Sequence, residues 1–561
     1  MATNVRVLIV VDGDGGYSAH NNRFGLTELI DAIESDAGDG LKFSVTKAHR
    51  YDAVTFANRY PMFEQGADIE KFVFTKDTFN IAAYDELWLF GFASSNGFGP
   101  YKDPINFDLQ HDELQVIEEF MESGGGVFAT GDHDDLGKDL CSTLPRVRSM
   151  RRWNFDYVKA GTDYTGYDEG SGDSPPVQGP YRHSTIVKNA EGHYEFDNQS
   201  DDIPQTVRPF LTTIASGTPY GRVYETLPHP LLCGLDGVIN VLPDHMHEGQ
   251  CQVPDDLTAT FDLNGEQRDE YPSYRGGPLS PQVVAWEDIV ARDVQPQFTD
   301  PYGARFPGSN DNEALEADTS GAIAAWDGHV VHRGRVVVDA TFHHFVNVNI
   351  VGVGDDLHEK NWSADESVKY LGLKSSTSPE AQAAYRHIRQ YWRNIARWLA
   401  PSTLQFSFGI HWIRNAAIDG RIRQEIGRAV DAAGQTRVGA AMRDIMGVFL
   451  PPCAQLAVSS VGIPDPLAIL LGHWYIIKTL PDPPPELPVT LAAMSQLCLG
   501  VSATVVRRLT AAAPNADDHE IASAIRETSE RALREFFIQQ EAAYEQAARN
   551  TGIWVKQLSR G

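Results

Sequence analysis

Residues 111–135 read HDELQVIEEFMESGGGVFATGDHDD, and this stretch decides the expected fold class. From His111 to Glu122 apolar residues recur at helical spacing, and the glycines at 124–126 end the helix. A short apolar segment, residues 127–130, follows directly and gives way to a polar cluster at Asp132. A helix that leads into a short buried strand is typical of a βαβ unit in a parallel sheet.

The same alternation precedes this stretch. Residues 5–11 (VRVLIVV), 42–47 and 86–92 (ELWLFGF) are predicted strands, and residues 23–35 are a predicted amphipathic helix. Strands that alternate with amphipathic helices imply right-handed crossovers and a sheet covered on both faces. We therefore expect an α/β fold with a doubly wound, mostly parallel sheet.

The composition changes at about residue 151. From 151 to 330 glycine, proline, aspartate and tyrosine abound and helical periodicity is scarce, so we expect a long irregular insertion with a buried strand at 238–242. The sheet is expected to resume at 335–341 (RVVVDAT). A helix that begins at Pro379 and stops at Pro401 then closes an α/β domain of residues 1–400.

Residues 401–561 are expected to form a helical domain. Its predicted helices lie at about 418–432, 434–449, 487–510 and 516–549, separated by proline-rich breaks. The apolar stripes of these helices indicate core packing or homo-oligomerisation through this domain, and not a cofactor site.

Charge and cysteine content limit the function classes. Forty-seven basic against 76 acidic residues give a formal net charge of −29, which opposes binding to nucleic acid or to an anionic membrane. The sequence shows neither a membrane span nor a secretory signal, so we expect a cytoplasmic protein. The five cysteines are odd in number and lack metal-site spacing, so we expect neither a disulfide framework nor a cysteine-based zinc site.

Three clusters of Asp and His follow predicted strands, at residues 131–135 (GDHDD), 244–248 (DHMHE) and 343–344 (HH). In open α/β sheets ligands bind at the carboxyl ends of the strands, where loops from different strands converge. We therefore expect the three clusters to outline one crevice. Thr130, Asp132 and His133 are expected at a sharp strand-to-helix turn that exposes its side chains. Alternatively, Asp132 or Asp134 caps a helix that begins near residue 136.

The second cluster is the strongest metal candidate. On a strand, His245 and His247 would face the same side, which permits joint ligation. We predict His245, His247 and Glu248 as ligands of a divalent zinc, iron or manganese ion, whose bound water Asp244 or Glu248 deprotonates. A surface turn with solvated charges is the alternative. Without a metal, the candidates for acid–base catalysis are Asp132, His133, Asp244, Glu248 and His343.

The third cluster offers one histidine to the crevice, because adjacent residues on a strand point to opposite faces. We favour His343 over His344 as the residue that faces the crevice, although the sequence supports the two almost equally. Substrate-binding candidates from the other loops are Asp12, Ser94, Asn96 and Arg148. Asp12 alternatively belongs to a simple turn, and the arginines at 146, 148, 151 and 152 alternatively pair with structural carboxylates. No nucleotide-binding motif occurs where it would be diagnostic, so no nucleotide cofactor is expected.

In the order of its motifs the chain resembles the class I glutamine-amidotransferase-like superfamily, most closely its ThuA-like branch, which is associated with sugar utilisation. Residues 120–128 (FMESGGGVF) look like that group's helix, glycine turn and central strand. Residues 229–231 (HPL) with the 244–248 cluster, and residues 334–338 (GRVVV) through His343, are similar to its later segments. The resemblance implies a flavodoxin- or amidotransferase-like sheet. Asp132 and His133 replace the nucleophilic cysteine of true amidotransferases, so amide transfer from glutamine is not implied.

These observations predict an enzyme that hydrolyses or rearranges a small polar, carbohydrate-derived substrate, by acid–base chemistry or with a metal. The contrasting hypothesis is an α/β domain that binds a small molecule without turnover and is coupled to a helical assembly or partner-binding domain. Cysteine-dependent amidotransfer through Cys141 would require an exposed thiol with a lowered pKa.

Overall fold

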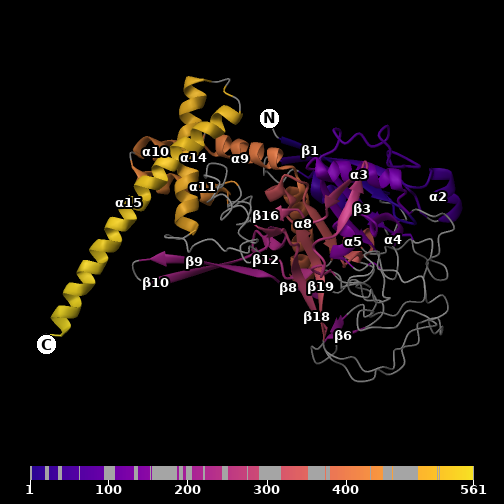
Figure 1. Ribbon diagram of the computed structural model, residues 1–561, viewed down its shortest axis with the longest axis horizontal. Coiled ribbons are helices and arrows are strands. Elements are labelled where there is room, and N and C mark those ends of the chain that lie inside the picture. The colour runs from indigo at the N-terminus through magenta and orange to yellow at the C-terminus, as the bar shows by residue number, and fades with distance from the viewer. Residues whose placement is uncertain are drawn as a thin grey trace.

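The computed structural model describes residues 3–18, 25–35, 41–61, 63–93, 108–131, 137–151, 153, 186–188, 194–196, 205–218, 221–242, 251–274, 276–289, 318–351, 373–374, 379–417, 419–429, 431–446, 458, 491–513, 516 and 518–559. Figure 1 shows an α/β body on one side and a group of helices, ending in one long projecting helix, on the other.

An eight-stranded sheet forms the centre of the α/β body. In spatial order its strands are β2 (Leu41–His49), β1 (Thr3–Val11), β3 (Glu86–Gly91), β4 (Gly126–Gly131), β20 (Val336–Asp339), β19 (Asp318–Trp326), β18 (Gln282–Ile289) and β8 (Arg208–Pro209). The first five are mutually parallel and the last three are added antiparallel. Every residue of β3 and β4 is buried, as expected of strands covered on both faces.

Seven helices belong to this body in the described part of the chain. They are α1 (Thr27–Glu34), α2 (Ala53–Arg59), α3 (His111–Glu122), α4 (Lys138–Cys141), α5 (Val147–Met150), α6 (Asn347–Val351) and α8 (Pro379–Leu399). The chain moves from β1 to β2 in one direction and from β3 to β4 in the other. Right-handed crossovers therefore place α1 and α3 on opposite faces of the sheet.

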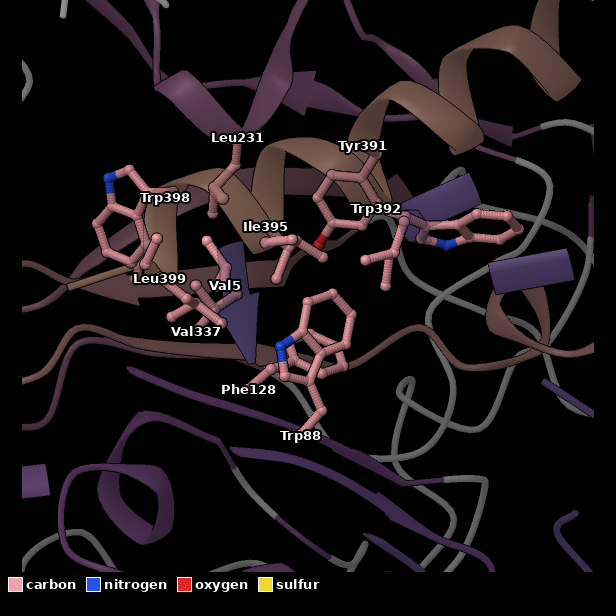
Figure 2. Packing of buried hydrophobic residues seen from close by; sticks show 14 of the residues in the cluster. Val5, Trp88, Phe128, Leu231, Val337, Tyr391, Trp392, Ile395, Trp398 and Leu399 are labelled. Carbon is pink, nitrogen blue, oxygen red and sulfur yellow. The ribbon is translucent and has the colours of Figure 1, made fainter. Parts of the chain in front are cut away.

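Helix α8 packs its apolar stripe onto the middle of the sheet. Figure 2 shows Trp392, Ile395 and Leu399 above strand residues such as Val337 and Phe128. All of these side chains are fully buried. At the amino edge of the sheet the fit is so close that a Cβ on Gly126 would lie 2.4 Å from the carbonyl oxygen of Leu399. This apolar face of the helix is part of the core.

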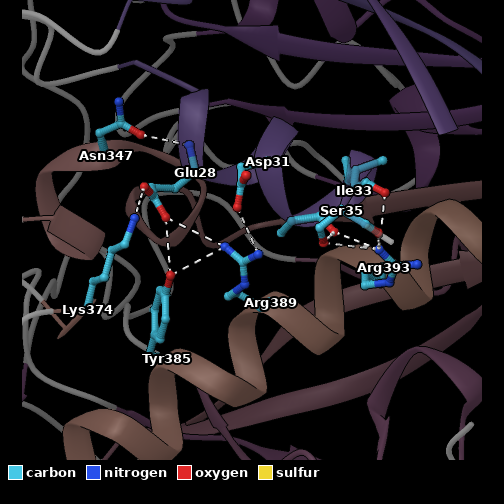
Figure 3. A network of polar contacts seen from close by, with 10 residues as sticks. Glu28, Asp31, Ile33, Ser35, Asn347, Lys374, Tyr385, Arg389 and Arg393 are labelled. Carbon is cyan, nitrogen blue, oxygen red and sulfur yellow. Dashed lines mark hydrogen bonds and ion pairs between the residues drawn. The ribbon is translucent and has the colours of Figure 1, made fainter. Parts of the chain in front are cut away.

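A polar network joins α8 to α1, across about 350 residues of sequence (Figure 3). Arg389 pairs with Asp31 at 2.9 Å, and Lys374 pairs with Glu28 at 2.7 Å. Arg393 donates to the carbonyl oxygens of Ala32, Ile33 and Ser35, so a positive charge caps the carboxyl end of α1. These contacts fasten the two helices side by side on one face of the sheet.

The insertion contributes β8, β18 and β19 to the main sheet, so the sheet resumes before the predicted strand at 335–341. Its other described strands form small antiparallel pairs. They are β9 (Leu211–Thr218) with β10 (Gly221–Pro228), β11 (Cys233–Gly234) with β12 (Gly237–Val238), β7 (Gln205–Thr206) with β13 (Val241–Leu242), β14 (Thr260–Leu263) with β15 (Glu266–Asp269), β16 (Ser273–Tyr274) with β17 (Gly277–Pro278), and β5 (Ile186–Lys188) with β6 (Tyr194–Phe196). The described residues here also form short 3₁₀ helices, namely η3 (Pro230–Leu232), η4 (Gly328–Val331) and η5 (His343–Phe345).

The predicted buried strand at 238–242 is wrong. Val238 ends the two-residue strand β12, and Val241 and Leu242 form β13; neither strand pairs with the main sheet. Val238 is exposed, whereas Ile239 and Leu242 are buried. The chain reverses direction just before this segment. Gly237, at the end of that turn, has a φ of 133°, which glycine adopts far more readily than other residues. The segment therefore packs locally, with β13 next to α8, and does not cross the sheet.

The carboxyl-terminal region is helical, as predicted. Its helices are α9 (Ser402–Ala417), α10 (Gly420–Arg428), α11 (Ala432–Met446), α14 (Leu491–Ala512) and α15 (Asp518–Leu558). Helices α11 and α14 cross at glycines, because a Cβ on Gly439 would lie 1.6 Å from the carbonyl oxygen of Gln496. Helix α9 was not predicted, since its apolar residues are spread around the helix and not gathered in one stripe. Among the described helices, none combines the length and apolar character of a membrane span.

Most of the described cysteines are buried free thiols. Cys141, Cys251 and Cys498 are free thiols, and burial raises the pKa of Cys498 to about 12. Cys233 is disulfide-bonded, which the sequence argument did not predict.

Candidate functional site at the carboxyl edge of the sheet

The five parallel strands end together at one edge of the sheet. In the pairing register Val11 lies opposite His49 and Phe90, Gly91 lies opposite Gly131, and Thr130 lies opposite Asp339. The segments that follow β1, β3, β4 and β20 therefore all leave from this edge. Ligands of open α/β sheets bind in this position, next to the point where the chain direction across the sheet reverses.

Asp12 lies at that reversal point, between β1 and β3. Its Oδ1 accepts hydrogen bonds from the backbone amides of Phe92 at 2.6 Å and Ala93 at 3.0 Å. Its Oδ2 is buried and has no hydrogen-bond partner. Burial, with a contribution from the charge of Asp139, holds the pKa of the Asp12 carboxyl well above its usual value. Asp12 thus links the loop after β1 to the loop after β3. Its carboxyl group can stay protonated at pH values at which most aspartates are ionised.

His49 is the last residue of β2, at the same edge of the sheet. Its Nδ1 accepts from the amide of Tyr51 at 2.8 Å, and its Nε2 lies 3.1 Å from the carbonyl oxygen of Gly15. Burial lowers the pKa of His49 to about 3, so the ring is neutral and donates to Gly15. This histidine fixes the loop after β1 and is not a proton carrier near neutral pH.

Arg151 and Thr130 tie the ends of β4 and β20 together. The fully buried guanidinium of Arg151 donates to the carbonyl oxygen of Asp339 at 2.5 Å and to that of Gly131 at 2.8 Å. The Thr130 hydroxyl lies 3.1 Å from the carbonyl oxygens of both Asp339 and Thr341. The expectation that Thr130 is exposed at the turn is wrong: it is fully buried and serves as a backbone tie.

A second buried network surrounds the Asp339 carboxylate. Oδ1 accepts from the amide of Thr341 at 2.8 Å and from its hydroxyl at 2.6 Å, and Oδ2 accepts from the Tyr391 hydroxyl of α8 at 2.6 Å. His344 is fully buried, with Nε2 at 3.6 Å from Oδ2 of Asp339. Of the two adjacent histidines, His344 therefore belongs to the core beneath the edge. His343 forms the first residue of η5.

Close approach of glycines shapes the edge between β3 and β4. A Cβ on Gly91 would lie 2.0 Å from Cα of Gly137, and Gly137 has a φ of 88°. Gly137 is the N-cap of α4, so neither Asp132 nor Asp134 is its N-cap residue. Cys141, at the end of α4, is fully buried, and burial raises the pKa of its thiol well above the usual value. Cysteine-dependent amidotransfer through Cys141 is contradicted by this burial.

The described arginines of the basic cluster bind other groups of the protein itself. Arg148, predicted to bind substrate, pairs with the buried carboxylate of Glu270 at 2.9 Å. Arg146 is fully buried, pairs with Glu122 at 2.8 Å and lies over the ring of Trp326. Arg151 binds backbone carbonyls as described above. The alternative reading, in which these arginines serve the protein's own structure, accounts for their contacts.

Most of the remaining predicted residues lie outside the described part of the chain. These are Ser94, Asn96, Asp132, His133, Asp244, His245, His247 and Glu248. Asp132 and His133 directly follow Gly131, the last residue of β4, and Ser94 directly follows Ala93. Within the described ranges, His, Cys, Asp and Glu residues form no group of three or more that could hold a metal ion.

Cys251 lies at the same edge, three residues after Glu248. Its amide donates to the carbonyl oxygen of Gly321 at 2.8 Å, and it forms a β-bridge with Arg151. Its thiol contacts the carbonyl oxygens of Ala322 and Val338. Cys251 is therefore fixed to β19 and β20 at this edge.

Sequence reasoning missed the residues that hold the edge together. Asp339 and Tyr391 are 52 positions apart, and Arg151 reaches Asp339 across 188 positions. The one available signal was an aspartate inside an otherwise apolar strand, RVVVDAT, where a buried charge requires partners. In comparisons with family models, curated proteins and solved structures, this chain has no match.

Proposed function

We propose that this chain is an enzyme that acts on a small polar, carbohydrate-derived substrate at the carboxyl edge of the sheet. The observation that carries the proposal is the parallel pairing of β4 with β20, in which Thr130 lies opposite Asp339. Asp132 and His133 leave the edge from β4, and His343 leaves it four residues after the end of β20. Two of the three Asp and His clusters therefore start from neighbouring strands.

We propose that the third cluster, residues 244–248, lies at the same edge as the other two, because a residue shortly after it is fixed there. Strand β13, which precedes Asp244, gives no support, because it lies in a separate small sheet. Cys251 supplies the support instead, since it pairs with Arg151, the residue that ties β4 to β20. We propose that Glu248, three residues before Cys251 in the sequence, lies near the first and third clusters.

Acid–base catalysis is the chemistry that this residue set supports. A solvated histidine titrates near neutral pH, and carboxylates beside it can orient the ring or take the complementary proton role. In the metal-assisted form, His245, His247 and Glu248 would hold a zinc, iron or manganese ion, which would supply an activated water. The residues of the edge would then bind and orient the substrate.

The strand order supports the finer fold assignment in the proposal. The order β2-β1-β3-β4-β20 matches the flavodoxin-like arrangement 2-1-3-4-5, in which the binding crevice lies between the first and third strands. We propose that the domain is a class I amidotransferase-like domain closest to the ThuA-like branch, with catalysis by Asp and His in place of cysteine. We further propose that it works in the cytoplasm, without nucleic-acid or membrane partners.

The test is turnover of a panel of monosaccharides, sugar lactones and sugar amides, followed by NMR, with metal content measured on the same samples. His133→Asn and His343→Asn are expected to lower turnover by about 10²-fold or more, because each removes a proton carrier. His332→Asn is the matched control. His332 is exposed at the opposite edge of the sheet, and asparagine tolerates its φ of 60°.

Four outcomes would separate these hypotheses. Turnover that survives both histidine substitutions would contradict the catalytic proposal. Saturable binding without turnover would favour the contrasting hypothesis, a binding domain coupled to a helical region. In the metal-assisted form, His245→Ala and His247→Ala lose stoichiometric metal together with activity. Full activity in metal-free wild-type protein would leave only the acid–base form.

A further inference from the structure

A polar face of α3 packs against the hairpin formed by β14 and β15. Gln115 fastens the two elements: its Nε2 donates to the carbonyl oxygen of Asp262 at 2.6 Å, and its Oε1 accepts from the amide of Asn264. The same Nε2 donates to the carboxyl group of Glu118 at 3.0 Å. Glu118 therefore lies where the helix meets the hairpin, and only 5% of it is exposed.

Glu118 differs from the other glutamates of α3 in its partners. Each of the other three pairs with at least one basic side chain: Glu113 with Arg50, Glu119 with Lys76, and Glu122 with Arg146 and Arg333. Within the described part of the chain, no basic group lies within ion-pair distance of Glu118. A buried carboxylate without a cation is costly to ionise, whereas a neutral carboxyl group can accept the amide of Gln115 at little cost.

Burial and nearby charges set the protonation of Glu118. Burial has the largest effect and raises the pKa of its carboxyl group to about 7. Asp262 of β14 and Glu122 of α3 raise this pKa further, and Arg148 and Arg146 oppose them. Both arginines already pair with other carboxylates, so neither neutralises Glu118 by direct contact. The charge of this buried group therefore changes near neutral pH.

Ionisation of Glu118 weakens the docking of the hairpin. With the hairpin docked, the carboxyl group holds its proton up to a pH of about 7, because its pKa is raised. With the hairpin detached, the group meets water, and its pKa returns to the ordinary value of 4.5. Docking is therefore fully favoured below pH 4.5 and loses stability as the pH rises to about 7. A two-stranded hairpin alone is marginally stable in water, so detachment opens its backbone hydrogen bonds.

We propose that Glu118 is a pH-sensitive contact, which holds the β14–β15 hairpin on α3 while its carboxyl group is protonated and releases the hairpin when the group ionises. The hairpin is connected to α5 through Glu270, the residue after β15, whose carboxylate binds Arg148 and Ser149. Helix α5 leads directly into Arg151 at the carboxyl edge of the sheet. The proposal does not depend on the reaction proposed at that edge.

The test is hydrogen exchange of the full-length chain at several pH values from 5.5 to 8, measured by mass spectrometry. The protection factor, which is the exchange rate of an unstructured chain divided by the observed rate, removes the intrinsic effect of pH. The protection factors of residues 260–269 are expected to fall by at least about tenfold over this range, because a raised pKa weakens docking by up to about tenfold per pH unit.

Glu118→Gln keeps an acceptor for Gln115 but cannot ionise, so its hairpin should keep nearly constant protection over the same range. Glu119→Gln is the matched control, since it removes the neighbouring carboxylate, which pairs with Lys76 at the surface. Its hairpin should lose protection as in wild type. Circular dichroism checks that each variant is folded.

Two results would overturn the proposal. The first is constant protection of the wild-type hairpin from pH 5.5 to 8. The second is an equal loss of protection in wild type and in Glu118→Gln, because another group would then control the hairpin.

Discussion

Replacing Arg151 with methionine is expected to lower the free energy of unfolding by about 3–5 kcal/mol, because hydrogen bonds to a charged donor contribute about 1.5–3 kcal/mol each. The guanidinium donates to the carbonyl oxygens of Gly131 and Asp339, and both strands end there in the buried part of the sheet. Methionine fills much of the same volume but leaves these carbonyls without their donor. The loss can be measured by urea unfolding, followed by tryptophan fluorescence.

Arg268→Met is the matched control for this prediction. Arg268 pairs with Glu266 on the surface, where both side chains are largely exposed, and such pairs contribute about 0–1 kcal/mol. Arg151→Lys should fall between wild type and Arg151→Met, since an ammonium keeps the charge but reaches fewer acceptors. If Arg151→Met unfolds within about 0.5 kcal/mol of wild type, Arg151 does not hold the edge together.

Arg151 should also act as a positioning residue. It ties the two strands that precede Asp132 and His343, so its loss should lower turnover even in the folded protein. The expected signature is a lower kcat in Arg151→Met with partial recovery in Arg151→Lys. A purely structural role would leave kcat unchanged under conditions in which both variants are folded.

Removing the carboxyl group of Asp12 is expected to have the second largest effect. In Asp12→Ala the buried amides of Phe92 and Ala93 lose their shared acceptor, and an unsatisfied buried group costs about 1–3 kcal/mol. Asp12→Asn keeps an oxygen acceptor in the same place. We therefore expect Asp12→Ala to unfold about 2–4 kcal/mol more easily than Asp12→Asn at every pH tested.

The pH dependence separates the charge of Asp12 from its hydrogen bonds. Its pKa is raised in the folded chain, so between the unfolded value and the folded value the native state binds the additional proton. Stability is then lost as pH rises through this window, by up to about 1.4 kcal/mol per pH unit. Asp12→Asn has no proton to lose, so it should gain relative to wild type as pH increases.

Urea unfolding of wild type and Asp12→Asn from pH 5.5 upward measures this difference. The lower limit keeps the protein above its isoelectric point of about 4.9. Comparing the two proteins cancels the contributions of other buried acids, such as Glu86, whose pKa burial also raises. A stability difference that stays constant from pH 5.5 to 8 would contradict a raised pKa at Asp12.

The elements that could be predicted from sequence were those whose signal is local. The apolar runs of β1 and β3, the helical period of α3 and the glycines at 124–126 each carry a structure within a few residues. The apolar stripe of α8 likewise identified its buried face. The segment at 238–242, four of whose five residues are apolar, was wrongly predicted as a central strand, because so short a segment does not distinguish a central strand from local packing.

The contacts that hold the site together join residues that are far apart in the sequence. The sequence pattern could therefore not predict them. Asn347 accepts from the amide of Glu28 and so caps α1 across more than 300 positions. Arg393 caps the other end of the same helix from α8. Thr130 looked like an exposed turn residue, yet register with β20 buries it. Such partners become visible only when the order of the strands is known.

The central claim is that the residues after β4 and the residues after β20 share one site, and cross-linking measures this directly. The variant His133→Cys/His343→Cys is treated with a short bis-maleimide of about 8–10 Å reach, comparable to the range over which catalytic side chains cooperate. Mass spectrometry then reports whether the two peptides are joined within one chain. The control is His332→Cys/His343→Cys, whose positions are separated by the length of β20.

The free thiols of the described residues, Cys141, Cys251 and Cys498, are buried and should react little. We expect an intramolecular link between positions 133 and 343 and none between positions 332 and 343. If both cysteines of the 133/343 variant react singly with maleimide but are never joined, the two clusters do not share one site.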